Sequence, residues 1–342
     1  PPSFYTIVLN ISNLENKKRK DQNMNTEIPQ KLKERFCRDC NLPIKIFEEP
    51  YFTERLKLLD TKCAFPGIIE QYNKFAKKIQ SYNNPQDFLE EYNKVKDDAT
   101  NFIKETQAYQ KFNEMDMNEF AKEIRKGLPS HDIFKPQNAG KYFISIDMRK
   151  ANFNALKNYD TTIFGKANTW EDFLSKFTNN SHIITSKYIR QVILGNCNPK
   201  RHVTYEKYLM NKFIDKMEEY FDADFLQKIV FFSNDEIVLD VTAYDETERT
   251  RLSDKLNSIA NNFLVPLKIE SFRLYKIKNT DGYLKDGTET QEIKCLDSVM
   301  YPIVLRKLLA PNVQEYDKVF IFNGLRAKLI DIPEIAFLAK PE

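Results

Sequence analysis

Two short runs of apolar, β-branched and aromatic residues, at 142–147 and 228–241, limit the folds open to this chain more than any other feature. Runs of this kind are typical of buried β-strands. The first run ends at Asp147, and the second is interrupted by Asp235 and Glu236 between two apolar segments. Because Asn-Asp at the interruption suits a tight turn, the second run predicts a β-hairpin. Both runs therefore predict strands that present carboxylates.

A helix is predicted between the two strand regions, at residues 204–220. Its apolar side chains recur every four residues and form one stripe, made of Tyr205, Leu209, Phe213 and Met217. We expect the helix to pack this stripe on the sheet. The core of the protein, residues 141–245, is therefore expected to be an α+β domain with an antiparallel sheet and packed helices.

The regions on either side of this core differ in character. Residues 1–126 are expected to be mostly helical, since apolar residues recur at spacings of three and four from residue 67 onward. Prolines and glycines mark residues 127–140 as a linker. Residues 246–342 are expected to form a C-terminal α/β extension. Its predicted elements are strands near 267–277 and 319–322 and helices after 245–255 and near 299–309.

A polar run at residues 10–26 follows a short predicted strand at 5–9 and contains Lys-Lys-Arg-Lys at 17–20. Its composition predicts a surface loop or extension, and the alternative is a basic arm that touches nucleic acid. The whole chain has 52 basic and 49 acidic residues, a formal net charge of +3. Any polyanion must therefore be held by a local patch.

The cysteines are odd in number and unevenly spread, which argues against a disulfide framework: Cys37, Cys40, Cys63, Cys197 and Cys295. No stretch of about 18 or more apolar residues occurs, and the first residues lack the features of a secretory signal. We expect a soluble, cytoplasmic protein in a reducing compartment, without membrane contact. Cys37 and Cys40 also form half of a zinc-ligand pattern with Cys63 as a distant third candidate, and the alternative is unlinked thiols.

Carboxylates delivered by two strands far apart in sequence are suited to a two-metal phosphoryl-transfer site. Paired ions about 3.5 to 4 Å apart stabilise the attacking and leaving oxygens, and hard ions such as Mg²⁺ or Mn²⁺ prefer carboxylate oxygen. Asp147, Asp235 and Glu236 are the candidate ligands. The alternative is structural: the Asp-Glu pair occupies an exposed hairpin turn, and Asp147 caps a following helix.

These residues resemble the palm domain of template-using polymerases. Residues 144–153 (ISIDMRKANF) resemble motif A, and residues 232–236 (FSNDE) resemble motif C in its reverse-transcriptase form. The turn from Gly195 to Pro199 and the following helix are similar to motif B, and the order A, B, C agrees. The resemblance implies an antiparallel palm-like sheet and Mg²⁺ (or Mn²⁺) as cofactor.

By the same resemblance, Asp147 and Asp235 bind the catalytic metals and Glu236 assists. Asn152 or Phe153 would lie near the incoming sugar. Within the wider palm superfamily the chain also resembles tRNA-His guanylyltransferase. Ile-Asp-Met-Arg at 146–149 approaches its Ile-Asp-Gly-Arg, and Ser-Asn-Asp-Glu at 233–236 approaches its Ser-Asp-Glu.

Basic residues gather near the proposed site. Lys187 and Arg190, three apart on a predicted helix, share one face, and Lys200 and Arg201 follow the turn at Gly195. They are expected to neutralise a triphosphate or template phosphate; an ordinary solvated helix face is the alternative. The candidate nucleotide- or phosphate-binding residues are therefore Arg149, Asn152, Phe153, Lys187, Arg190, Gly195, Lys200 and Arg201.

The expected function is metal-dependent transfer of nucleotides to a nucleic acid 3′ end. The expected partners are nucleic acid and nucleoside triphosphates, and further protein chains are an option. No glycine-rich phosphate loop is present, so nucleotide handling is expected to go through metal. One alternative is a palm-like, non-catalytic subunit that binds nucleic acid or supports a larger assembly. A further alternative is a nucleotide cyclase or an enzyme that adds nucleotides to a 5′ end.

Overall fold

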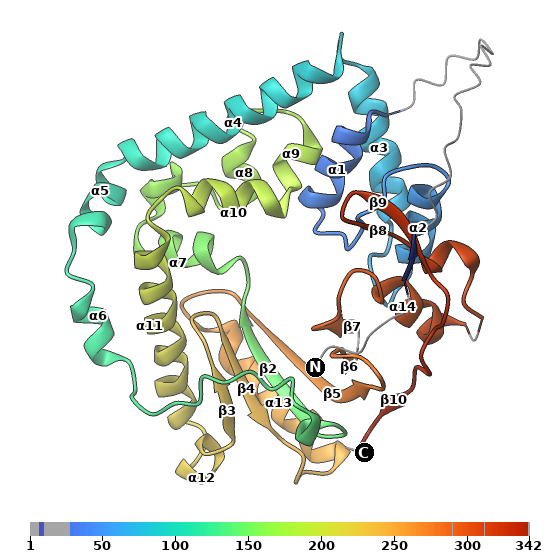
Figure 1. Cartoon of the computed structure of the whole chain (residues 1–342). Helices are drawn as coiled ribbons and strands as arrows, with labels where there is room; N and C mark the ends of the chain where they lie inside the picture. Colours follow the sequence, from blue (N-terminus) through green and yellow to red (C-terminus); the bar gives the residue numbers. More distant parts are fainter. Residues whose placement is uncertain (1–6, 10–27, 289, 311, 341–342) are drawn as a thin grey trace, which may run out of the picture. The chain divides into compact units, whose positions relative to one another are not determined.

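A computed structural model of the chain describes residues 7–9, 28–288, 290–310 and 312–340 (Figure 1). The polar run 10–26 and its basic residues lie outside this part. Of the strand predicted at 5–9, the described portion is β1 (Ile7–Leu9). The architecture is α+β, as predicted, with many helices and a smaller antiparallel sheet.

Two compact units make up the chain, and each is assembled from separate segments. Unit 1 comprises Pro1–Glu90, Ile277–Leu284 and Gln291–Phe337, and unit 2 comprises Glu91–Lys276, Lys285–Thr290 and Leu338–Glu342. These units do not follow the predicted boundaries at 126, 140 and 245. The difference arises because both predicted terminal regions contribute to unit 1, where Arg55 is in ion-pair contact with Asp317.

In the part of the chain that the structure describes, unit 1 contains helices from the N-terminal region and a small sheet from both ends of the chain. The sheet has the strand order β1-β9-β8. The described elements that begin in this unit are α1 (Gln30–Asp39), α2 (Tyr51–Leu59), α3 (Ile68–Gln80), α4 (Pro85–Glu105), β6 (Tyr283–Gly287), β7 (Gln291–Lys294), α14 (Tyr301–Leu309), η3 (Glu315–Lys318), β8 (Val319–Phe322), β9 (Leu325–Leu329) and β10 (Phe337–Leu338).

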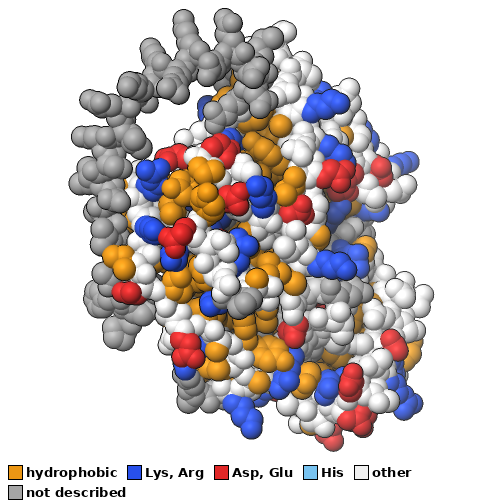
Figure 2. Space-filling view, turned by 90° about the vertical axis from the view of Figure 1, so that its right-hand side faces the viewer, with side chains coloured by type: hydrophobic (Ala, Val, Ile, Leu, Met, Phe, Trp, Pro, Cys, Tyr) orange, Lys and Arg blue, Asp and Glu red, His pale blue; other side chains and the backbone are white. Residues whose placement is uncertain are grey.

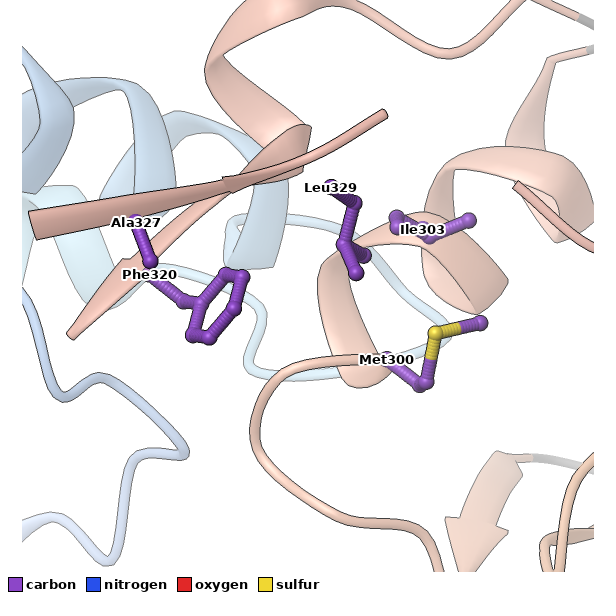
Figure 3. Packing of buried hydrophobic residues seen from close by; sticks show 5 residues of the cluster. All are labelled: Met300, Ile303, Phe320, Ala327 and Leu329. Atoms are coloured by element: carbon purple, nitrogen blue, oxygen red, sulfur yellow. The ribbon is translucent and has the colours of Figure 1, made fainter. Parts of the chain in front are cut away.

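The sheet of unit 1 packs on α14 through a small apolar cluster. Met300 and Ile303 from the helix region meet Phe320, Ala327 and Leu329 from the β8–β9 hairpin (Figure 3). The hairpin reverses at Asn-Gly, 323–324, where both φ angles are positive, as a two-residue turn requires. The Asn-Gly turn in the sequence therefore determines where the chain reverses. The buried face of the hairpin packs against α14.

The described elements that begin in unit 2 are α5 (Gln107–Glu114), α6 (Asn118–Glu123), η1 (Pro136–Asn138), β2 (Tyr142–Met148), α7 (Ala151–Tyr159), η2 (Thr161–Phe164), α8 (Trp170–Leu174), α9 (Ser181–Thr185), α10 (Lys187–Gly195), α11 (Pro199–Glu218), α12 (Ala223–Leu226), β3 (Ile229–Phe232), β4 (Glu236–Asp240), α13 (Glu246–Asn261) and β5 (Leu267–Ile277). Their sheet has the antiparallel order β3-β4-β2-β5, with β6 beside β5 (Figure 1). With α7 to α10 treated as an insertion, the succession is β2-α11-β3-β4-α13-β5. This is the β-α-β-β-α-β, ferredoxin-like arrangement.

The two faces of this sheet differ in chemistry because successive side chains point to opposite sides. On one face Ile144 and Ile146 of β2 are buried beside Leu239 and Ile237 of β4. Helix α13 covers this face, since its Arg249 stacks on Tyr142 of β2. The opposite face carries the polar residues of β2, including Asp147.

Helix α11 begins earlier than predicted. Pro199 is its first residue, a position where the missing proline N–H costs nothing, and Asn198 before it has a positive φ of 53°. The predicted stripe is confirmed, because its four side chains are all buried: Tyr205, Leu209, Phe213 and Met217.

Helix α13 starts with a capping box. Asp245 Oδ1 accepts from the Glu248 backbone N–H (2.8 Å), and Glu248 Oε2 accepts from the Asp245 N–H (2.9 Å). We expect Asp245→Ala to lower the free energy of unfolding by about 1 kcal/mol, because the Glu248 backbone N–H loses its side-chain partner. Urea denaturation followed by circular dichroism measures the loss. Asp254→Ala, an exposed site on the same helix, is the control, and an equal loss there would contradict the capping explanation.

The surface mixes apolar and charged side chains. Figure 2 shows hydrophobic patches separated by both acidic and basic groups on one face, so neither sign of charge dominates it. The exposed large apolar residues of unit 1 are Leu309, Tyr316, Phe322, Leu325 and Ile330. Among the described residues, no helix has the length and apolar character needed to cross a membrane.

Candidate functional site

The two acidic motifs meet on the polar face of the unit 2 sheet. Asp147 of β2 lies directly opposite Glu236 of β4 in the antiparallel register. The Met148 backbone N–H donates to the Asp235 carbonyl at 2.8 Å, which fixes the hairpin end beside β2. Directly opposite residues on adjacent strands have Cβ atoms about 4.5 to 5.5 Å apart. The structure therefore brings the predicted carboxylates into one cluster.

Serine side chains orient this cluster. Ser145, buried on β2, donates its hydroxyl to Glu236 Oε1 at 2.6 Å. In the turn, Ser233 Oγ accepts the Glu236 N–H (3.1 Å) and donates to Asp235 Oδ1 (3.3 Å). The hairpin turn is as predicted, but Glu236 is the first residue of β4 and is half-buried. It is therefore not simply an exposed turn residue.

Asp147 does not cap the following helix, which was the structural alternative for this residue. The residue that precedes α7 is Lys150, with φ 46°, and no side chain caps the helix there. Asp147 instead lies next to the end of β2, one residue before Met148. Its carboxylate therefore lies on the polar face of the sheet.

The burial and negative charge of the cluster alter the pKa of Asp147. Burial, together with the negative charges of Glu236 and Asp235, raises its pKa from 3.8 to about 6, although Lys285 and Lys268 act in the opposite direction. A carboxyl group whose pKa is raised this far loses its proton less readily in the folded protein than in the unfolded chain. The site therefore favours either a proton or a cation.

Asp147→Asn is expected to stabilise the protein by about 1 to 2 kcal/mol at pH 7, after allowance for the solvated part of the side chain. The pKa of Asp147 is raised to about 6 on folding, so its ionisation destabilises the folded state above that pH. The penalty fades between pH 6 and pH 4 and is absent below both pKa values. Urea denaturation of both proteins at pH 7 and pH 4.5, followed by Trp170 fluorescence, measures it. A gain that does not shrink at the lower pH contradicts the assignment.

Asp240→Asn provides the matched control, with the opposite sign. Although burial acts to raise it, hydrogen bonds from Thr242 and Lys141 hold the pKa of Asp240 below its usual range. Its ionisation therefore stabilises the folded state at pH values above the ordinary aspartate range, and that contribution is lost as the pH falls. We expect this variant to be less stable than the wild type at pH 7.

Glu206 of α11 is a functional candidate that the sequence analysis missed. It is buried, and its Oε2 accepts a hydrogen bond from the Asn234 amide at 2.8 Å. Burial and the nearby Asp235 raise its pKa to about 7, against the effect of the Asn234 hydrogen bond. The available signal was a glutamate that directly follows Tyr205, the first residue of the apolar stripe of the predicted helix. The hydrogen bond between Asn234 and Glu206 joins α11 to the acidic hairpin.

The donor set of the cluster suits a hard divalent cation. Within the described residues, no group of three or more His, Cys, Asp or Glu side chains stands in an arrangement that could hold a metal ion. Mg²⁺ is usually held by one or two carboxylates and completes its shell with water and substrate phosphates. Asp147, Asp235 and Glu236 do not form such a group of three, so Mg²⁺ binding by one or two of these carboxylates stays a prediction.

The candidates that follow motif A have different surroundings. Arg149 is exposed, and the Asn152 side chain accepts the N–H of Phe153. The Phe153 ring is buried against Phe164 (4.6 Å between ring centroids) and Trp170 (5.9 Å). Its expected place near a sugar is therefore corrected, because the ring belongs to the apolar core of unit 2.

The basic candidates also differ in their surroundings. Lys187 and Arg190 lie on α10, as predicted, and burial lowers the pKa of Arg190 despite the nearby Glu171. Gly195 and Lys200 are exposed.

Arg201 requires a correction. Its guanidinium donates to the Phe112 carbonyl (2.9 Å) and to the Met115 carbonyl, so it caps the C-terminal end of α5. The predicted phosphate contact for Arg201 does not agree with these bonds. Arg201 was predicted from its neighbours in the sequence, which do not reveal that α5 packs there.

None of the five cysteines, all of which lie in the described part of the chain, forms a disulfide. Burial raises the pKa of Cys37 above the usual thiol range, with a contribution from Cys40, and burial raises that of Cys40 to about 12. Cys63 donates to Gln291 Oε1 at 3.1 Å. The raised pKa values mean that these surroundings favour protonated thiols. Because zinc binds thiolates, they do not favour zinc binding at Cys37 and Cys40.

No family model, curated protein or solved structure matches the chain. The β-α-β-β-α-β arrangement does not supply a function either, since widely shared folds support many unrelated activities. What the chain does is therefore argued from the site: a cross-strand acidic pair, a third carboxylate in the adjoining turn, and a buried glutamate behind the hairpin.

Proposed function

We propose that this protein catalyses Mg²⁺- or Mn²⁺-dependent nucleotidyl transfer to a nucleic acid 3′ end, with a palm-type site. The observation that carries the proposal is the cross-strand pair of Asp147 and Glu236, with Asp235 fixed beside it by the hydrogen bond from Met148. Two further features support it. The acids lie on the sheet face opposite α13, and the surrounding topology is an antiparallel β-α-β-β-α-β unit, as the palm resemblance implies.

Each residue has a defined task in this reaction. Divalent ions, when bound, would stabilise the attacking and leaving oxygens of the phosphoryl group. Asp147 and Asp235 hold them, and the Ser145 hydroxyl orients Glu236 through its 2.6 Å bond. Glu206 fixes Asn234 and thereby the turn that carries Asp235. Preorganised carboxylates of this kind need no rearrangement when charge develops in the transition state.

The partners follow from the chemistry. Nucleoside triphosphates and a nucleic acid are the substrates, and Lys187 and Arg190 of α10 are the cations proposed to meet their phosphates. We place the protein in a cytoplasmic, reducing location; its cysteines form no disulfide in the structure.

The test is a nucleotide-incorporation assay with the full chain, Mg²⁺ or Mn²⁺, labelled nucleoside triphosphates and primed DNA or RNA templates. Growth of the primer 3′ end is the expected result. Label at a 5′ end, or in a small cyclic product, would replace the polymerase proposal with one of the other nucleotidyl-transfer reactions. Nucleic-acid binding without incorporation under any condition would favour the non-catalytic, partner-dependent role.

A further inference from the structure

Cations and aromatic rings alternate along one row of side chains in unit 2. Arg249 of α13 stacks its guanidinium on the ring of Tyr142 in β2, 3.8 Å from the ring centroid. From the neighbouring strand β5, Arg273 lies over the same ring (5.0 Å) and over the ring of Tyr275 (5.1 Å). We call the full set the cation–tyrosine row. In order, its members are Lys228, Tyr244, Arg249, Tyr142, Arg273 and Tyr275.

The row extends beyond Arg249 to a third cation. The Arg249 guanidinium donates to the Tyr244 carbonyl, and Lys228 Nζ lies 5.4 Å from the centroid of the Tyr244 ring. All members of the row are partly exposed. The row therefore lies at the surface of unit 2 and is not part of its core.

No carboxylate takes part in the row. Among the described residues, Lys228, Arg249 and Arg273 are in ion-pair contact with no acid. Arg273 donates from Nε to the Gly140 carbonyl at 3.1 Å, and Arg249 uses one Nη for the Tyr244 carbonyl. The remaining N–H groups of both guanidinium forks are therefore open to a ligand. Because two guanidinium groups beside one ring repel each other, an anion bound to both would stabilise the arrangement.

The acids near this end of the sheet are occupied by other groups or lie apart from the row. Asp240 pairs with Lys141 at 3.1 Å. Asp245 and Glu248 form the capping box of α13, and Glu246 is exposed in the same first turn, where the helix dipole is positive. Cations and acids are thus about equal in number in this region. What distinguishes the row is that its cations are unpaired and are held in place by tyrosine rings.

We propose that the cation–tyrosine row binds a single-stranded segment of nucleic acid, at a second site apart from the acidic cluster. Tyr142 precedes Asp147 on β2 by about 17 Å along the strand, and its side chain points to the opposite face of the sheet. The row is therefore separate from the proposed metal ligands. The inference does not rest on nucleotidyl transfer, because a strand held here need not be extended.

The alternation of charge and aromatic ring favours a single strand over other polyanions. Proteins bind single-stranded nucleic acid with basic groups that follow the backbone and with aromatic side chains on which bases stack. Arginine forks match the geometry of phosphate oxygens. Tyr142, which contacts both arginines, is a positioning residue that orients their guanidinium groups. Tyr275 ends the row and contacts only Arg273 within it, so it is the ring assigned to stack on a base.

Fluorescence anisotropy of a labelled, mixed-sequence single-stranded oligonucleotide tests the row, with the full chain and no divalent metal. We expect Arg249→Ala and Arg273→Ala each to weaken binding at least about fivefold and to reduce the slope of log affinity against log salt by about 0.7. Arg249→Lys, which keeps the charge, should leave the slope unchanged. Tyr275→Leu should weaken binding at least about fivefold without changing the slope, because it removes stacking and no charge.

Arg251→Ala is the matched control, since Arg251 is exposed on the same helix and carries an equal charge outside the row. It should change the affinity by less than about twofold. No binding by the wild type, or losses in Arg249→Ala and Arg273→Ala no larger than in Arg251→Ala, would overturn the assignment of the row. Unchanged binding by Tyr275→Leu, with tripolyphosphate displacing the oligonucleotide, would reveal a site for bare anions and overturn the assignment of a strand.

Asp147→Asn separates this inference from the proposed function. This variant should bind the oligonucleotide as the wild type does, because Asp147 lies outside the row. A large loss of binding would mean that the acidic cluster holds the strand, and the row would lose its assignment. Binding that depends on Arg249 and Arg273 in a protein that incorporates no nucleotide would leave the second site standing and remove the polymerase proposal.

Discussion

Asp147→Asn and Asp235→Asn are each expected to lower the rate of nucleotide addition by at least about a hundredfold to a thousandfold. Each substitution replaces a carboxylate that we propose as a metal ligand by an amide of the same shape, so bound ions would lose a charged oxygen ligand while packing is preserved. Single-turnover incorporation at saturating Mg²⁺ measures the effect, because it separates the chemical step from product release. Asp147→Asn is the more informative variant, since it should be inactive and yet more stable.

Asp240→Asn is the control for this experiment. Asp240 belongs to the same strand as Glu236 but lies at its other end, where it pairs with Lys141 at 3.1 Å and accepts the Thr242 N–H at 3.0 Å. We expect its activity to stay within a few fold of the wild type even though the protein is less stable. A comparable loss in the control would show that general destabilisation, rather than the loss of metal ligands, lowers the rate.

Asp317→Ala is expected to destabilise unit 1 by about 3 to 5 kcal/mol, the usual cost of breaking a buried ion pair by removing one partner. Asp317 is buried and binds Arg306 through two hydrogen bonds (2.8 and 3.2 Å). It also contacts Arg55 at 3.5 Å and accepts the Gln314 N–H at 2.8 Å. Without the carboxylate, the largely buried Arg55 keeps only backbone carbonyls as partners. Its pKa, already lowered to about 10 by burial, shows how poorly that environment supports the charge.

Urea denaturation with two probes locates this loss. Trp170, the single tryptophan of the chain, is buried in unit 2, so its fluorescence reports on that unit. Circular dichroism reports on both units. We expect Asp317→Ala to move the far-ultraviolet transition to lower urea while the fluorescence transition changes less. Coincident shifts would mean that the two units unfold as one.

Glu315→Ala is the matched control for Asp317, two residues away on the same short helix. Glu315 is exposed and pairs with Lys318 and Lys328 at the surface. Exposed ion pairs contribute little to stability, so the midpoint should be nearly unchanged. If both variants shift the midpoint equally, burial of the charge is not the cause.

Much of the sheet could be predicted from local pattern. The run at 142–147 became β2 (Tyr142–Met148), and the second run became β3 and β4 around the predicted turn. Strand preference and turn chemistry are properties of a few neighbouring residues, so a single sequence carries them. The same holds for the stripe of α11, whose four predicted members are all buried.

Predictions that depended on contacts between residues far apart in the chain were less successful. Phe153 was assigned to the site by resemblance to motif A and Arg201 by its place in the sequence, yet Phe153 packs in an aromatic cluster and Arg201 caps α5. Glu206 was overlooked because its burial depends on how α11 lies beside the hairpin. The unit boundaries depend in the same way on contacts between the two ends of the chain, such as Arg55 with Asp317.

Residue order alone thus specifies where strands, turns and amphipathic helices form and which of them bear carboxylates, because those properties are local. The register that sets Asp147 between Glu236 and Lys268 exists only in the folded sheet. So does the raised pKa of Asp147, which needs both burial and nearby charge. Chemistry at this site depends on distances between residues far apart in the chain, and only packing can bring such residues together.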